Sequence, residues 1–471
     1  MKGKFIQNIS ANTVQQIINQ VFGLIIFYVL STQFSKDIFG QFNWCLAVLL
    51  TAFNILSFGI DQVIVRKIAE GKNTASLLSL YLFHVLYAGI LFYAMIGISY
   101  FIFPKTDIRF YLLLVIGLGK LLIFISTPFK QIVSGLEKFH WLALMSVCSN
   151  IIRGIALLIA AYMHVVSIQT VVIIFVSGDL TELLVCIMLY KKNIGLHLQY
   201  GLLKKEYIAL LKESMPQIGV VLFTSAMARF DWIFIGLILS AAKLAEYSFA
   251  YKVFEMATLP LIVIAPLLLP TFTRLIKQKR QIAAFYPIVR IEMGIVFFSI
   301  LLLNICWVPA IDFITKGKYG AVNSTTILVL SLCLPFLYLT NFLWSILFAK
   351  GQLKIIFWIF SITFCINLAG DIIFIPLFSN EGAAVAYILA LLVQLILYVY
   401  RIPEIEARHI FKPLLISVIT ALISGYLFHY WFDNALFLSL SGSLGLFLLL
   451  QWITGQLKLS DLSEMNKLMS S

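Results

Sequence analysis

Long apolar runs joined by short polar links occupy almost the entire chain of 471 residues. A helix needs about 20 apolar residues to cross the hydrocarbon core of a bilayer, whereas transmembrane β-strands alternate in polarity over about ten. The length and number of the runs therefore predict an all-α integral membrane protein with about fourteen transmembrane helices. The expected spans are residues 9–32, 41–65, 77–103, 110–133, 140–163, 167–190, 214–240, 246–273, 285–311, 322–349, 354–378, 382–401, 411–431 and 435–456.

The charge of the chain suggests its orientation in the membrane. Only 12% of the residues are charged, compared with about 25% in a typical soluble domain. The net charge of +13 does not call for a nucleic-acid partner, because Lys and Arg gather in the cytoplasmic loops of membrane proteins. When both termini are placed in the cytoplasm, most of the 34 Lys and Arg residues fall on that side. We therefore expect a multi-pass protein with both termini in the cytoplasm and no nucleic-acid partner.

The two halves of the chain contain similar short motifs. Gly135–Lys138 (GLEK) precedes a span that contains Asn150, and Gly351–Lys354 (GQLK) precedes one that contains Asn367. A parallel repeat predicts two pseudo-symmetric six-helix lobes around a central site, although chance similarity between apolar helices is the alternative. We expect an N-lobe with helices 1–6 at 1–191, a cytoplasmic linker at 192–213, a C-lobe with helices 7–12 at 214–402, and helices 13 and 14 with a C-terminal tail at 403–471.

Several expected spans contain ionisable residues far from their ends, where each costs roughly 2.5–3.5 kcal/mol on insertion scales. Such residues usually face the bundle interior or a water-filled cavity. Guanidinium and ammonium groups bind phosphate, and carboxylates can take up protons or coordinate sodium. The candidates for substrate binding are Arg153, Arg229, Lys120 and Lys252, and those for ion coupling are Asp179, Glu182, Glu255, Asp231 and Asp371.

Structural ion pairing is the alternative role for these charges. Lys252 and Glu255 are three residues apart and can pair with each other on one face of a helix. Glu292 lies near the expected cytoplasmic end of its span and can sit at the membrane interface with Arg290. The sequence leaves both roles open for each charge.

The sequence contains no zinc-ligand spacing, Gly-rich phosphate loop or nucleophile elbow, so we do not expect an enzyme, a cofactor or a metal site. It also contains no recognisable ATP-binding domain. Active transport would then depend on a gradient of H⁺ or Na⁺, or on a partner.

Several short motifs occur in a characteristic order along the chain. They are Asn12–Gln20, Phe39–Asn43, Phe58–Asp61, Arg66–Ala69, Phe230–Trp232, Tyr247–Tyr251, Ala349–Gln352, Asn367 and Glu381–Ala386. In this order they resemble the Wzx-like polysaccharide and O-antigen flippases of the multidrug/oligosaccharidyl-lipid/polysaccharide (MOP) superfamily, over nearly the whole chain.

This resemblance implies two six-helix lobes around a central, cationic cavity, plus two peripheral helices. It implies that the protein moves undecaprenyl-diphosphate-linked oligosaccharides from the cytoplasmic to the outer leaflet of a bacterial inner membrane by alternating access. The product would be O-antigen, capsule or exopolysaccharide. The implied partners are the lipid-linked oligosaccharide, membrane lipids, a polysaccharide polymerase and a chain-length regulator.

Three other functions remain as alternatives. A multidrug or cation exporter of the MATE branch often carries an acidic residue in its first span, where this chain has only Asn and Gln as polar candidates. A lipid II flippase has a similar architecture, and the sequence separates it poorly from the main hypothesis. A membrane glycan polymerase or ligase usually has a large external loop, and the longest outer loops expected here are only about ten residues.

Overall fold

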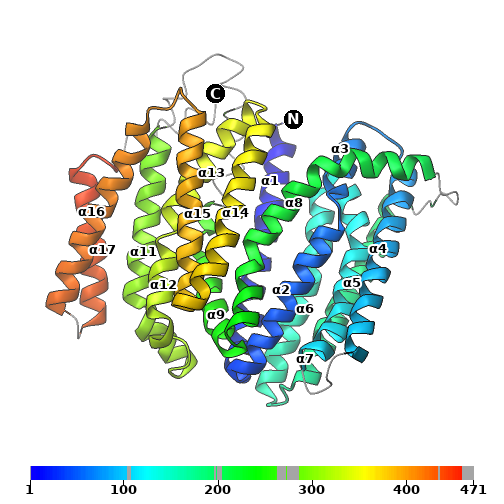
Figure 1. Cartoon of the computed structure of the whole chain (residues 1–471), viewed down its shortest axis with the longest axis horizontal. Coiled ribbons are helices and arrows are strands. Elements are labelled where there is room, and N and C mark those ends of the chain that lie inside the picture. The colour runs from blue at the N-terminus through cyan, green and yellow to red at the C-terminus, as the bar shows by residue number, and fades with distance from the viewer. Residues whose placement is uncertain are drawn as a thin grey trace. The chain divides into compact units, whose positions relative to one another are not determined.

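A computed structural model of the chain describes residues 2–102, 108–195, 198, 204–261, 272, 286–432 and 435–458. These residues form helices without strands, as the apolar runs predict (Figure 1). The first nine helices are α1 (Lys2–Gln33), α2 (Lys36–Leu56), α3 (Ile60–Ala69), α4 (Thr74–Ile102), α5 (Ile108–Gly135), α6 (Phe139–Tyr162), α7 (Ile168–Asn193), α8 (Lys204–Ile238) and α9 (Ala241–Ala257). The remaining helices are α11 (Tyr286–Thr315), η2 (Ala321–Asn323), α12 (Ser324–Ser331), α13 (Leu334–Ala349), α14 (Leu353–Phe378), α15 (Asn380–Arg401), α16 (Ala407–Phe432) and α17 (Leu436–Ile453).

Twelve spans within the described ranges are long and apolar enough to cross a membrane. They correspond to the expected spans except the seventh and eighth, so the all-α membrane class is confirmed and the number fourteen is approximate. The seventh expected span lies in α8, which begins earlier than predicted, at Lys204. The eighth begins in α9, and its residues 262–271 and 273 lie outside the described residues.

Two expected spans are interrupted rather than continuous. The span expected at 41–65 is divided into α2 and α3 by Ser57, Phe58 and Gly59. Gly59 has a φ of 66°, and a Cβ at this position would lie 2.4 Å from Cβ of Gln217 on α8. Only glycine satisfies both the left-handed backbone and the close approach of α8. The span expected at 322–349 is likewise divided into α12 and α13, with a proline in the first turn of α13.

The contacts divide the chain into two compact units, Met1–Ala245 and Glu246–Ser471. In the first unit α5, α6 and α7 pack on one another, α1 packs on α6, and α2 packs on α5 and α8. In the second unit α14 and α15 pack together, and α11 packs against α12, α13, α16 and α17. Figure 1 shows the first unit in blue to green and most of the second in light green to red. The predicted six-helix repeat and its lobe boundaries stay a prediction.

Side-chain contacts at the helix ends stabilise the first unit. Ser35 accepts a hydrogen bond from the Ile38 N–H at 3.3 Å and so caps the start of α2. Near the end of α3, Lys67 pairs with Glu213 of α8 at 2.7 Å, and Arg66 pairs with the same carboxylate. The hydrogen bond from Lys67 lowers the pKa of Glu213, which precedes the expected seventh span.

Candidate functional site

The candidate site in the first unit begins with two carboxylates on α7. Asp179 and Glu182 are three residues apart, so they lie on one face of the helix. Their residues are 0% and 4% exposed. Since a buried ionised carboxylate is costly without a counter-charge, a cation from a neighbouring helix would stabilise each of them.

Two cations from two helices meet at Asp179. The Lys120 Nζ of α5 lies 3.3 Å from Oδ2, and the Arg153 guanidinium of α6 pairs with Oδ1. Lys120 and Arg153 are both buried. Asp179 therefore joins α5, α6 and α7 through ion pairs that solvent hardly reaches.

A second pair forms at Glu182. The Lys130 Nζ of α5 lies 2.6 Å from its Oε1, and the Ser149 hydroxyl of α6 donates to its Oε2. The sequence analysis did not select Lys130 as a site residue. Its position inside the expected span at 110–133 is the signal that would have identified it.

Arg153 also contacts groups other than Asp179. Its Nε donates to the Phe175 carbonyl at 3.4 Å, and its Cζ lies 5.0 Å from the centroid of the Phe175 ring. Its Nη1 donates to Asn150 Oδ1 at 3.4 Å, and Asn150 Nδ2 donates to Asn19 Oδ1 of α1 at 3.0 Å. The guanidinium is thus held by protein groups in this conformation.

Two glycines allow the helices to approach at this cluster. A Cβ at Gly119 would lie 2.4 Å from Oδ2 of Asp179, and one at Gly178 would lie 2.8 Å from Cγ of Arg153. Each glycine directly precedes a charged member of the cluster, Lys120 or Asp179, in the sequence. We call Lys120, Lys130, Ser149, Arg153, Asp179 and Glu182 the ion-pair cluster; it contains three cations and two carboxylates.

The other candidates form smaller, local arrangements. The Arg229 Cζ lies 4.5 Å from the centroid of the Trp232 ring. The Oδ1 of the buried Asp231 accepts a hydrogen bond from the backbone N–H of Trp232 at 2.8 Å. Lys252 and Glu255 pair at 2.7 Å along α9, which is the local pairing that their spacing allows.

In α14, the buried residues Asn367 and Asp371 are joined by a hydrogen bond of 2.9 Å from the amide to Oδ2. The structure therefore brings together four of the nine predicted site residues, Lys120, Arg153, Asp179 and Glu182, and joins Lys252 to Glu255. The functional roles that the sequence analysis assigned to all nine stay predictions.

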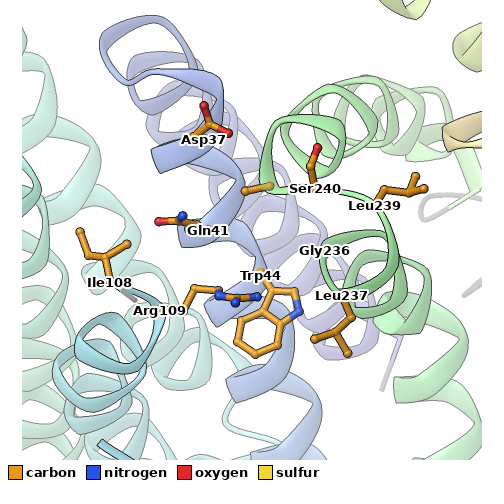
Figure 2. Close-up of a pocket in the computed structure, with 10 residues that line it drawn as sticks. Asp37, Gln41, Trp44, Ile108, Arg109, Gly236, Leu237, Leu239 and Ser240 are labelled. Carbon is orange, nitrogen blue, oxygen red and sulfur yellow. The ribbon is translucent and has the colours of Figure 1, made fainter. Parts of the chain in front are cut away.

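A surface pocket of about 540 Å³ in the first unit contains none of these residues. Figure 2 shows Trp44 and Arg109 next to each other, with Asp37 and Ser240 higher in the view. The Arg109 Cζ lies 5.3 Å from the centroid of the Trp44 ring, while Trp44 Nε1 donates to the Ile233 carbonyl at 3.2 Å. Sequence reasoning missed this pocket because its residues come from α2, the start of α5, the end of α8 and the beginning of α9.

Comparisons with known proteins identify a family and a fold. A family model described as "Polysaccharide biosynthesis protein" matches residues 5–276. No curated protein sequence matches the chain.

Among solved structures, the inward closed conformation of the lipid II flippase MurJ is similar, with a TM-score of 0.75 and 17% identity over 94% of this chain and 98% of that one. An inward-facing MATE family multidrug resistance transporter of the MOP superfamily gives a TM-score of 0.67 and 12% identity over 82% of this chain and 94% of that one. A point mutant of the Vibrio cholerae MATE transporter VcmN gives a TM-score of 0.59 and 13% identity over 86% of this chain and 97% of that one. At these identities the similarity shows the fold alone.

Proposed function

Because the chain belongs to the polysaccharide biosynthesis protein family, we propose that it is a flippase for undecaprenyl-diphosphate-linked oligosaccharides in the bacterial inner membrane. The family match is the observation that carries this proposal. The fold shared with MurJ and the MATE transporters supports a MOP-superfamily transporter or flippase rather than a catalytic enzyme. The oligosaccharide would move from the cytoplasmic to the outer leaflet and supply O-antigen, capsule or exopolysaccharide synthesis. A polysaccharide polymerase and a chain-length regulator would then use it.

The basic residues suggest how the diphosphate would be held. Phosphate oxygens accept the same charge-assisted hydrogen bonds from guanidinium and ammonium groups as a carboxylate does. In the ion-pair cluster, Arg153 and Lys120 are engaged by Asp179. The incoming diphosphate would therefore have to replace this carboxylate as their partner. Arg229 and Lys252 complete the proposed set of cations.

Coupling to a gradient would reset the transporter after each release. Alternating access requires that binding energy differ between the two conformations. We propose that H⁺ or Na⁺ acts at one or more of the carboxylates that the sequence selects, which are Asp179, Glu182, Glu255, Asp231 and Asp371.

A deletion strain tests the transported substrate. We expect mass spectrometry of its lipid extract to find accumulated undecaprenyl-diphosphate oligosaccharide, together with loss of the surface glycan. Accumulated lipid II instead would favour a lipid II flippase, whose fold this chain shares. Unchanged lipid intermediates with new drug sensitivity would favour an exporter.

Variants of Arg153 test the proposed phosphate contact. Arg153→Ala and Arg153→Lys should each reduce glycan export, because lysine retains the charge but not the planar fork of donors. Arg401→Ala is the matched control, since Arg401 is exposed at the end of α15 and lies outside the cluster. Normal export by both Arg153 variants would contradict the role. A fall in protein level that parallels the fall in export would assign Arg153 to structural pairing only.

A further inference from the structure

Glu292, in the second unit, is a buried carboxylate without a counter-charge among the residues that the structure describes. It is the seventh residue of α11, and it is 0% exposed. Neither Oε1 nor Oε2 has a hydrogen-bond partner, and no ion pair reaches it from the part of the chain that the structure describes. The sequence analysis allowed this residue to sit at the membrane interface with Arg290, where a charged carboxylate would be solvated. Because it is completely buried, its carboxylate is not solvated.

The helices packed against α11 offer Glu292 little electrostatic support. On α13, the Tyr338 hydroxyl donates to the Ala257 carbonyl at 3.1 Å rather than to Glu292. The helices α12 and α17 contain no Asp, Glu, Lys, Arg or His. On α16, Arg408 and Lys412 are exposed, and His409 stacks on Tyr286 with 4.0 Å between ring centroids.

The remaining charged neighbours in sequence do not neutralise Glu292 either. Arg290 lies two positions earlier on α11, so it projects about 200° away around the helix. Val289, Met293 and Val296 of the same helix are apolar and fully or almost fully buried. Burying an unpaired carboxylate in such surroundings costs more than burying the neutral acid. The surroundings therefore favour the protonated form of Glu292.

We propose that Glu292 is a proton-binding site of the transporter, protonated in this conformation and deprotonated when a conformational change brings water to it. The carboxylic acid would transfer its proton to water on one side of the membrane and regain one from water on the other. One proton is then carried per cycle, and no bond other than O–H is broken or formed. The coupling part of this inference rests on the proposed transport function, whereas the protonation itself does not.

The ion-pair cluster explains why Glu292 suits this role better than the carboxylates of the first unit. Adjacent cations favour the ionised form of a carboxylate, and Asp179 has the Lys120 Nζ at 3.3 Å and also pairs with Arg153. Such a group binds a proton only after its ion pair is broken. Glu292 has no such pair to break within the described structure.

Infrared spectroscopy of the purified full chain tests the protonation directly. Near neutral pH, the difference between wild type and Glu292→Gln should contain one carbonyl-stretch band of a protonated carboxylic acid that shifts in D₂O. Glu381→Gln is the matched control, because the Glu381 carboxylate accepts a hydrogen bond from the Thr326 hydroxyl at 2.9 Å; this substitution should leave the band intact. If Glu292→Gln does not fold, Glu292→Leu provides the same comparison. A wild-type spectrum without the band would overturn the proposal.

Reconstituted vesicles test the coupling. The probe is the lipid-linked oligosaccharide extracted from the deletion strain, with and without an imposed pH gradient. Glu292→Gln should lose the gradient-dependent increase in flipping and retain the exchange seen without a gradient, while Glu381→Gln behaves as wild type. An undiminished response of Glu292→Gln to the gradient would overturn the coupling role. If wild type moves no oligosaccharide, the proposed function fails, and the infrared band still decides whether Glu292 binds a proton.

Discussion

Asp179 and Glu292 are both completely buried carboxylates, one in each unit, and their surroundings are opposite. Asp179 has cations from two helices beside it, whereas Glu292 has no hydrogen-bond partner among the described residues. The comparison teaches that burial alone does not define the role of a charged residue in a membrane protein. The paired carboxylate joins three helices, whereas the unpaired one suits the proton-binding role proposed for Glu292.

The largest expected effect is the loss of the charge at Asp179. Asp179→Asn leaves Lys120 and Arg153 buried without their shared counter-charge, and breaking such a pair costs about 3–5 kcal/mol. We expect a marked fall in the melting temperature of the purified protein in detergent. Glu255→Gln, which breaks the more exposed pair with Lys252, is the control and should have a smaller effect. Equal effects would remove the distinction between buried and exposed pairing.

At Glu292 we expect the loss of the carboxylate to raise the melting temperature rather than lower it. Glu292→Leu removes two polar atoms that make no hydrogen bond to any described residue, and removing an unsatisfied buried group stabilises the folded state by up to about 3 kcal/mol. The melting temperature should therefore rise, although the proposed coupling is lost. A clear fall in melting temperature would show that Glu292 has a partner in the folded protein, and the comparison with Asp179 would no longer hold.

Close packing around Asp179 gives a third expectation. Gly119→Ala places a methyl group 2.4 Å from the present position of Asp179 Oδ2, and overpacking of this kind costs roughly 1–3 kcal/mol. The methyl group should cost less in an Asp179→Ala background, where the carboxylate is absent. Thermal unfolding of the two single variants and the double variant measures this coupling. Additive effects would show that Gly119 does not contact Asp179.

The smallest effect belongs to an ion pair outside the spans. Lys350 pairs with Glu404 at 2.7 Å, and the Glu404 side chain is 54% exposed. The hydrogen bond from Lys350 lowers the pKa of Glu404. The pair therefore stabilises the folded state above the unfolded pKa of this carboxyl, and the contribution is lost as the pH falls through the lower folded pKa. Solvent screening limits it to less than about 1 kcal/mol.

Melting curves as a function of pH check this last expectation. The difference between wild type and Glu404→Gln should shrink in acid and also in high salt, because an exposed pair is screened. The difference between wild type and Asp179→Asn should resist salt. If salt weakened both equally, the ion-pair cluster would have to be open to solvent.

Much of the local architecture was predictable from the chain. The apolar runs located twelve of the expected spans, because the cost of placing polar groups in hydrocarbon acts on each segment separately. The pairing of Lys252 with Glu255 was also predictable, since residues three apart on a helix are neighbours. The break before α3 was not predicted, although Phe58–Gly59 lay within a motif that the sequence analysis selected.

By itself, the sequence determined the membrane class, the order of twelve membrane spans and the identity of their charged residues, since hydropathy is a local property. Only the tertiary structure decided which charges on different helices meet. Lys130 reaches Glu182 from a different helix, and Glu292 lies in a region of the second unit where the described helices bring it no counter-charge. The physical reason is that a helix specifies the direction of its own side chains, whereas the partner of each side chain depends on how the helices pack.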